Sequence, residues 1–139
     1  MSGARSDHGG GPSGGGDSLS ALLGITDYEH PSEELARARL PVTPRICQPY
    51  GIVHGGAYAA LAETVASRAT WEVVGPELGA FGQSNDTSFL RAVRDGVIEA
   101  EARARHRGRT TWVWDVEIND AEGRLCALSR LPITNRFVG

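Results

Sequence analysis

The residues best suited to chemistry lie in one stretch, where a histidine and two glycines precede an alanine-rich run. His54, Gly55 and Gly56 come directly before that run. If a helix begins there, its first backbone N–H groups have no acceptor within the helix and lie at the positive end of its dipole. Such a terminus can bind a carbonyl oxygen that gains negative charge, and glycine lets the carbonyl approach closely. Alternatively, the two glycines only permit a tight turn into the helix.

Glu63 lies in the middle of the alanine-rich run, between apolar residues. If the sheet wraps this part of the helix, the carboxylate is costly to desolvate, and its presence there needs a reason. The alternative is a polar stripe, because Glu63, Ser67 and Thr70 have the i, i+4, i+7 spacing of one helix face. Such a stripe would contact water or a neighbouring subunit. The spacing leaves both interpretations open.

Gly55 and Glu63 cannot readily serve the same carbonyl from one helix. Eight residues of helix correspond to about 12 Å along the axis, which is more than a glutamate side chain spans. If both residues act in one reaction, Gly55 of one protomer must work with Glu63 of another. We therefore expect at least a two-fold dimer.

Other common catalytic centres are disfavoured. The four histidines do not combine with cysteines or carboxylates in a metal-ligand spacing, so we expect no metal. No serine lies in a GxSxG motif, and no glycine cluster is followed by the Lys-Ser or Lys-Thr of a phosphate-binding loop. Arginines beside predicted turns are available for the phosphates of a nucleotide, although such arginines are usually solvated surface residues.

The elements that must position these residues are one long helix and several strands. Residues 55–74 are rich in alanine, contain no proline and stop at Gly75-Pro76, which predicts the long helix. A short helical turn over residues 19–25, capped by Asp17 or Ser18, and a half-buried strand over residues 35–42 are predicted before it. Four strand-like runs separated by turn signals follow it: residues 80–93, 97–106, 110–118 and 125–134.

This order predicts an α+β fold in which one curved antiparallel sheet wraps around one central helix. Small side chains on one face of the run 97–106 would leave room for that helix. The strand–helix alternation of a dinucleotide-binding fold is missing. We expect a single domain over residues 18–139, preceded by a disordered tail over residues 1–17 that contains seven glycines.

Bulk composition argues against several classes of protein. A net charge of −3 and a pI near 5.8 over 139 residues provide no broad positive field for nucleic acid or an acidic membrane. The longest apolar run, residues 57–62, is far shorter than the roughly 20 residues that span a bilayer. The N-terminus lacks the apolar core of a secretion signal, so we expect a cytoplasmic protein whose Cys47 and Cys126 are reduced.

Three blocks, GIVHGGAYAALAE, GQSNDTSFLRAVRDG and HRGRTTWVWDVEINDAEGRLCALS, resemble the hotdog-fold thioesterases. The likeness spans residues 44–133 and is greatest to the 4-hydroxybenzoyl-coenzyme A thioesterases of the Arthrobacter type, with phenylacetyl- and dihydroxynaphthoyl-coenzyme A hydrolases slightly further away. It implies the hotdog fold and hydrolysis of an acyl- or aryl-coenzyme A thioester, with no cofactor beyond the coenzyme A of the substrate. It also implies a homotetramer, built as a dimer of dimers, with active sites at subunit interfaces.

The resemblance also implies roles for residues around the helix. Glu63 would be the nucleophile or general base, and the Gly55 N–H would bind the thioester carbonyl. Gln48 would orient that carbonyl or the water, while His54 would shape the loop. Ser67 stands where the resembled family has a threonine that helps to position the water, and it keeps the hydroxyl.

Substrate-binding residues are implied further along the chain. Thr110 matches a threonine near the active site, and Arg109, the other candidate substrate contact, stands where the resembled family has serine. Arg91 and Arg136 match positions that bind the phosphates of coenzyme A. The acyl group stays undetermined, because the large aromatic residues could line an aromatic pocket or fill the core: Trp71, Phe81, Phe89, Trp112 and Trp114.

Two other functions remain open. A hotdog dehydratase or hydratase usually pairs a histidine with a carboxylate and has a proline-containing loop after the histidine, but here His54 is followed directly by two glycines. A non-catalytic acyl-coenzyme A-binding regulator would need neither Glu63 nor the glycine terminus. Thiol release across a panel of coenzyme A thioesters would separate these functions.

Overall fold

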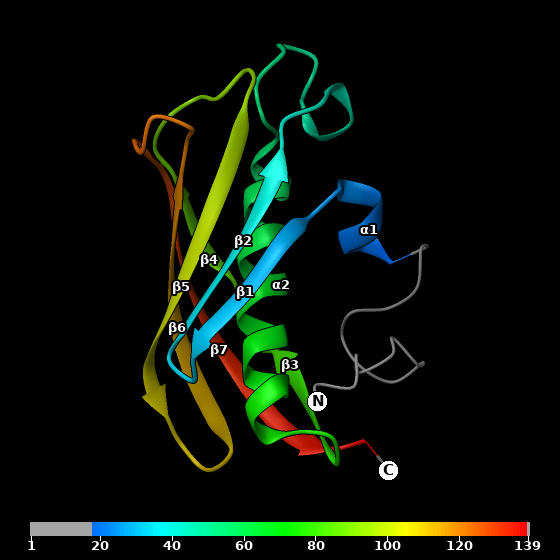
Figure 1. Cartoon of the computed structure of the whole chain (residues 1–139), viewed down its shortest axis with the longest axis vertical. Coiled ribbons are helices and arrows are strands. Elements are labelled where there is room, and N and C mark those ends of the chain that lie inside the picture. The colour runs from blue at the N-terminus through cyan, green and yellow to red at the C-terminus, as the bar shows by residue number, and fades with distance from the viewer. Residues whose placement is uncertain (1–17, 139) are drawn as a thin grey trace.

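The computed structural model describes residues 18–138, in which a curved sheet wraps around a long helix (Figure 1). Seven strands of the described residues form one antiparallel sheet in the order β1-β2-β5-β6-β7-β3, and β4 also pairs with β7. The strands are β1 Thr26–Ser32, β2 Leu35–Pro41, β3 Leu78–Gly82, β4 Asp86–Phe89, β5 Val97–Arg107, β6 Thr111–Asn119 and β7 Leu125–Phe137. The predicted α+β arrangement is confirmed, whereas the predicted tail over residues 1–17 lies outside the described residues.

The long helix α2, Gly55–Val74, begins and ends at the predicted residues. At its start, Nδ1 of His54 accepts the N–H of Gly56 at 2.8 Å, and at its end the Gly75–Pro76 step cannot continue the helix. A short helix α1, Leu19–Leu23, precedes the sheet, and Ser18 is its N-cap. The predicted helical turn over residues 19–25 is therefore confirmed with Ser18 as its cap, but it ends at Leu23 because Gly24 adopts a left-handed conformation.

Small side chains on the sheet let α2 pack closely against it. Ala36 and Ala38 of β2 pair with Ala102 and Ala100 of β5, and all four are 0% exposed. On β6, Trp114 is also completely buried. Helix α2 therefore packs on the predicted face of small side chains, and larger side chains such as Trp114 fill the space beside the helix.

One strand prediction was wrong, and one strand was missed. Residues 80–93 do not form one strand: the chain leaves β3 at Gly82 and pairs again from Asp86 onward as β4. Strand β1 was missed because it lies at the sheet edge and is mostly exposed, so that its sequence shows no apolar alternation. Two strands therefore precede α2, and five follow it in the described chain.

Candidate active site

The N-terminus of α2 presents a free backbone amide. His54 uses Nδ1 to accept the N–H of Gly56 at 2.8 Å, and its carbonyl accepts the N–H of Ala57 at 2.9 Å. Within residues 18–138, no acceptor takes the N–H of Gly55. Since Nδ1 is an acceptor, the neutral imidazole carries its proton on Nε2. His54 thus sets the start of the helix and leaves the Gly55 amide available for a carbonyl oxygen.

An open cavity of about 430 Å³ surrounds this amide and brings Gln48, Gly55 and Arg91 together. It adds Tyr58 and Phe89, whose rings lie 6.1 Å apart. The Phe89 ring lies over Gly55, so that a β-carbon at position 55 would sit only 2.9 Å from it. Burial raises the pKa of Tyr58 to about 12, so its phenol stays protonated at neutral pH. Glycine therefore leaves this amide accessible, whereas a side chain at position 55 would have to displace the exposed Phe89 ring.

Glu63 faces a second open cavity, together with Ser67 and Asn85. Its carboxylate is exposed rather than wrapped by the sheet, so a desolvation cost is the wrong reason to single it out. Nδ2 of Asn85 donates to Oε1 of Glu63 at 3.2 Å and to the carbonyl of Ala59 at 2.9 Å. A β-carbon on Gly82 would lie 3.1 Å from Glu63 Cδ. The strand end and the following loop therefore confine the carboxylate from one side.

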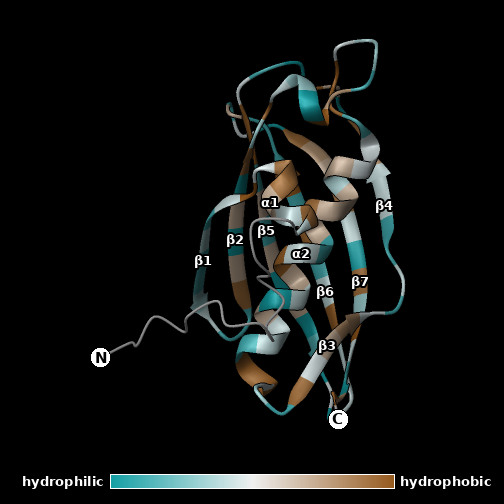
Figure 2. Cartoon of the chain, turned by 90° about the vertical axis from the view of Figure 1, so that its right-hand side faces the viewer, coloured by the Kyte–Doolittle hydropathy of each residue, from teal (hydrophilic) through white to brown (hydrophobic). Residues whose placement is uncertain are grey.

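The proposed polar stripe is wrong at its third member. Thr70 is 0% exposed, donates to the carbonyl of Ala66 at 2.9 Å and accepts the indole N–H of Trp114 at 2.8 Å. Glu63 and the half-buried Ser67 instead lie on the face of α2 that the sheet leaves uncovered. Figure 2 looks onto this face, with α1 lying in front of α2.

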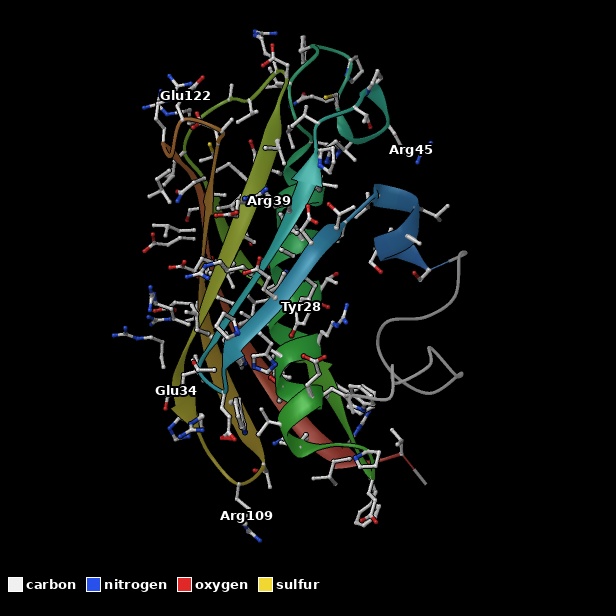
Figure 3. All side chains as sticks on the ribbon, in the orientation of Figure 1. Tyr28, Glu34, Arg39, Arg45, Arg109 and Glu122 are labelled. Carbon is white, nitrogen blue, oxygen red and sulfur yellow. The ribbon has the colours of Figure 1, made fainter. Side chains whose placement is uncertain are left out.

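Two of the predicted substrate-binding residues, Arg109 and Thr110, lie at the end of the sheet opposite the N-terminus of α2. Figure 3 shows Arg109 at the far tip of the molecule from Arg45, which lies in a short helical turn before Gln48. The carbonyl of Thr110 accepts the N–H of Asn135 at 2.8 Å. Arg109 and Thr110 are therefore distant from the N-terminus of α2 of the same protomer.

Arg91 and Arg136 are also far apart. The N–H of Arg91 donates to the carbonyl of Cys126, whereas Arg136 follows ten residues later on β7. Ten extended residues correspond to roughly 33 Å. The guanidinium of Arg136 lies over the Phe81 ring at 4.6 Å. One protomer thus places its two predicted phosphate-binding arginines at different ends of the sheet.

Sequence reasoning did not single out Asn85 and Tyr58, and it listed Phe89 only among aromatic residues without a defined place. Asn85 lies 22 residues beyond Glu63, in a segment predicted to be mid-strand. Glycine, serine, asparagine and aspartate favour turns, so Gly82, Ser84 and Asn85-Asp86 were local signals that the strand breaks there. No spacing rule links that break to the helix.

Other kinds of site find little support in the part of the chain that the structure describes. Residues 18–138 contain no group of three or more His, Cys, Asp or Glu side chains that could hold a metal ion. No helix in this range is long and apolar enough to cross a bilayer. Cys47 and Cys126 are free thiols.

Comparisons with known proteins identify the family of the chain. The model of the thioesterase superfamily matches residues 50–127. The chain is 35% identical to the 1,4-dihydroxy-2-naphthoyl-CoA hydrolase of Escherichia coli over 79% of its length and 82% of that protein. It is 36% identical to the proofreading thioesterase EntH of Klebsiella pneumoniae, covering 83% of each chain.

Solved structures give the same result. A mutant of thioesterase PA1618 from Pseudomonas aeruginosa superposes with a TM-score of 0.82 at 35% identity, over 88% of each chain. Thioesterase HI1161 of Haemophilus influenzae has a TM-score of 0.82 at 34% identity, over 88% of this chain and 85% of that one. The helix wrapped by a curved sheet is thus the hotdog fold, and the chain is a thioester hydrolase that belongs to the thioesterase superfamily.

Proposed function

We propose that the protein hydrolyses an acyl-coenzyme A thioester with an aromatic acyl group, such as 4-hydroxybenzoyl-coenzyme A, in a site shared by two protomers. One observation carries the shared site: the free Gly55 amide and the exposed Glu63 carboxylate face different cavities of the same protomer. They are about 12 Å apart along α2. The aromatic class is supported by the similarity to a dihydroxynaphthoyl-CoA hydrolase.

A two-fold axis can unite the two groups. Ala59 lies midway between Gly55 and Glu63, so an axis level with Ala59 would place Glu63 of each antiparallel helix opposite Gly55 of the other. Ala59 and Ala60 are small enough for helix axes to approach to about 8–10 Å. Asn85 is bonded to the Ala59 carbonyl, so the edge of the sheet between β3 and β4 lies at the same level. Two such dimers would form the proposed homotetramer.

At the shared site, the Gly55 N–H would polarise the thioester carbonyl and stabilise the oxyanion of the tetrahedral intermediate. Glu63 would either attack the carbonyl carbon to form an anhydride, which water then cleaves, or remove a proton from the attacking water. In both routes the C–S bond breaks, coenzyme A leaves as a thiolate that takes up a proton, and the carboxylic acid remains. Gln48 would orient the carbonyl, and Ser67 would orient the water.

The distribution of the basic residues extends the shared-site proposal to coenzyme A. Arg91 lies beside Gly55, whereas Arg109, Thr110 and Arg136 lie at the other end of the sheet. Because a single coenzyme A tail does not bridge roughly 33 Å of strand within one protomer, these contacts would come from different protomers. A guanidinium suits this role because it donates two hydrogen bonds to a phosphate.

Thiol release from a panel of coenzyme A thioesters, with wild type and Glu63→Gln side by side, tests the activity. Glu63→Gln should lower kcat at least ~100-fold, about 2.7 kcal/mol of transition-state stabilisation, and substrate binding should survive. Glu63→Asp should retain a measurable rate because water can span part of the missing methylene. Glu117→Gln, an exposed carboxylate on the sheet, is the matched control. A Glu63→Gln rate within about threefold of wild type would disprove the catalytic role.

Subunit mixing tests the shared site separately. Glu63→Gln subunits and Gly55→Val subunits should each be inactive alone. Random exchange at equal amounts makes half of the dimers mixed, each with one intact site, so about a quarter of wild-type activity should return. If exchange is verified by mass spectrometry and no activity returns, the sites are not shared.

A further inference from the structure

A chain of hydrogen-bonding side chains connects the sheet to Glu63. Thr87 of β4 and Ser129 of β7 are a cross-strand pair whose hydroxyl oxygens lie 2.7 Å apart. Thr87 donates to Oδ1 of Asn85 at 2.5 Å, and Nδ2 of Asn85 donates to Oε1 of Glu63 at 3.2 Å. Ser129 is only 5% exposed, so the chain runs from the interior of the sheet to the exposed carboxylate.

The direction of each hydrogen bond in this chain is determined. The Glu63 carboxylate and the Ala59 carbonyl only accept hydrogen bonds, so the amide nitrogen of Asn85 must face them and uses one N–H for each. Oδ1 of Asn85 then faces Thr87, whose single O–H donates to it. The hydroxyl of Ser129 must consequently donate to Thr87. A flipped amide would place its oxygen against two acceptors, so only one arrangement is favourable.

We propose that Asn85 is a positioning residue that holds the Glu63 carboxylate in its working orientation, an inference that rests on the proposed role of Glu63. An exposed glutamate otherwise samples several rotamers. Asn85 restrains Oε1, and Gly82 lies so close to the other carboxylate oxygen that a β-carbon there would be 3.2 Å from Oε2. Catalysis depends on holding the reacting group in place before the reaction. The chain through Thr87 in turn restrains the amide of Asn85.

A purely structural role for Asn85 makes a different prediction. The bond from Asn85 to the Ala59 carbonyl ties the loop after β3 to α2. If this tie were the only role, loss of Asn85 would lower stability or substrate binding whether or not position 63 carries a carboxylate. If Asn85 acts through Glu63, its effect on kcat must depend on that carboxylate.

A double-mutant cycle measured by thiol release separates the two roles. Asn85→Ala should lower kcat tenfold or more, with KM within about twofold of wild type. Asn85→Asp should be at least as slow, because a carboxylate replaces the donor beside Glu63. In the Glu63→Gln background, Asn85→Ala should change the residual rate less than twofold. Equal losses in both backgrounds, or Asn85→Ala with wild-type kcat, would overturn the positioning role.

The hydrogen bond from Thr87 to Asn85, which relays the restraint from the sheet, provides an independent check. Thr87→Val keeps the shape of the side chain but removes the donor to Asn85, and should lower kcat about threefold. Thr87→Ser keeps the hydroxyl and should retain more activity than Thr87→Val, whereas equal rates of the two variants would remove the relay from the proposal. An active Glu63→Gln enzyme would overturn the proposed catalytic role of Glu63 and the positioning role together. An inactive Glu63→Gln enzyme with fully active Asn85→Ala would overturn the positioning role alone.

Discussion

The buried contact between Thr70 and Trp114 is a direct test of how α2 packs on the sheet. Both residues are 0% exposed, and the indole N–H donates to the Thr70 hydroxyl at 2.8 Å. Thr70→Val replaces that hydroxyl with a methyl group of similar size, so it opens no cavity. It also leaves the indole N–H buried opposite a methyl group. The variant therefore measures the hydrogen bond more than the packing.

The expected loss follows from the buried donor. A buried polar group that loses its partner costs about 1–3 kcal/mol, so we expect a loss of about 2 kcal/mol of unfolding free energy. With a urea slope of about 2 kcal/mol per molar, the unfolding midpoint should fall by about 1 M. Because α2 is helical before and after the change and Val and Thr have similar helix propensities, the helix itself contributes little to the difference.

Urea unfolding followed by tryptophan fluorescence and circular dichroism measures this loss. Protomer concentration must be equal in all samples, because the stability of an oligomer depends on it. Thr64→Val is the matched control: the same substitution, on the same helix, at a half-buried side chain. It should move the midpoint by less than about 0.25 M. A Thr70→Val midpoint within the same range would show that the hydroxyl does not stabilise the core, and the reasoning would be wrong.

Three further predictions concern the substrate, the helix terminus and pH. Arg91→Ala and Arg136→Ala should each raise KM about tenfold, with a smaller change in kcat. The rise in KM should be smaller on a thioester lacking the nucleotide, and an equal rise on both substrates would contradict phosphate binding. Gly55→Ala should lower kcat without changing the circular dichroism spectrum, because its methyl group collides with an aromatic ring, and unchanged kcat would argue against the amide. The hydrogen bond from Arg130 holds the pKa of Asp115 below its usual range. The pair therefore stabilises the folded state by at most about 1 kcal/mol above about pH 4, and this contribution is lost as pH falls through the lowered pKa. Urea midpoints of wild type and Asp115→Asn should therefore differ at pH 7 and converge in acid, whereas a constant gap would refute the assignment.

Elements with local signals were predictable from the sequence. The long helix was predicted at its observed bounds, because alanine-rich composition and a Gly-Pro stop act within a few residues. The strands β5, β6 and β7 were found to within three residues at each end, since alternating side chains and turn residues are also local signals. The edge strand β1 was missed because its mostly exposed residues show no apolar alternation, and the break after Gly82 was missed although turn-forming residues follow it.

The candidate site divides in the same way. The sequence by itself determined that Gly55 starts a helix and that Glu63 lies too far along it to share a substrate within one protomer. Only the tertiary structure decided that Thr70 points into the core while Glu63 stays exposed, because the curvature of the sheet selects which helix face is covered. It also decided that Asn85 reaches Glu63 across 22 residues of chain. The periodicity of the sequence specifies on which face of the helix a residue lies, but the segment that packs against this face is distant in the sequence.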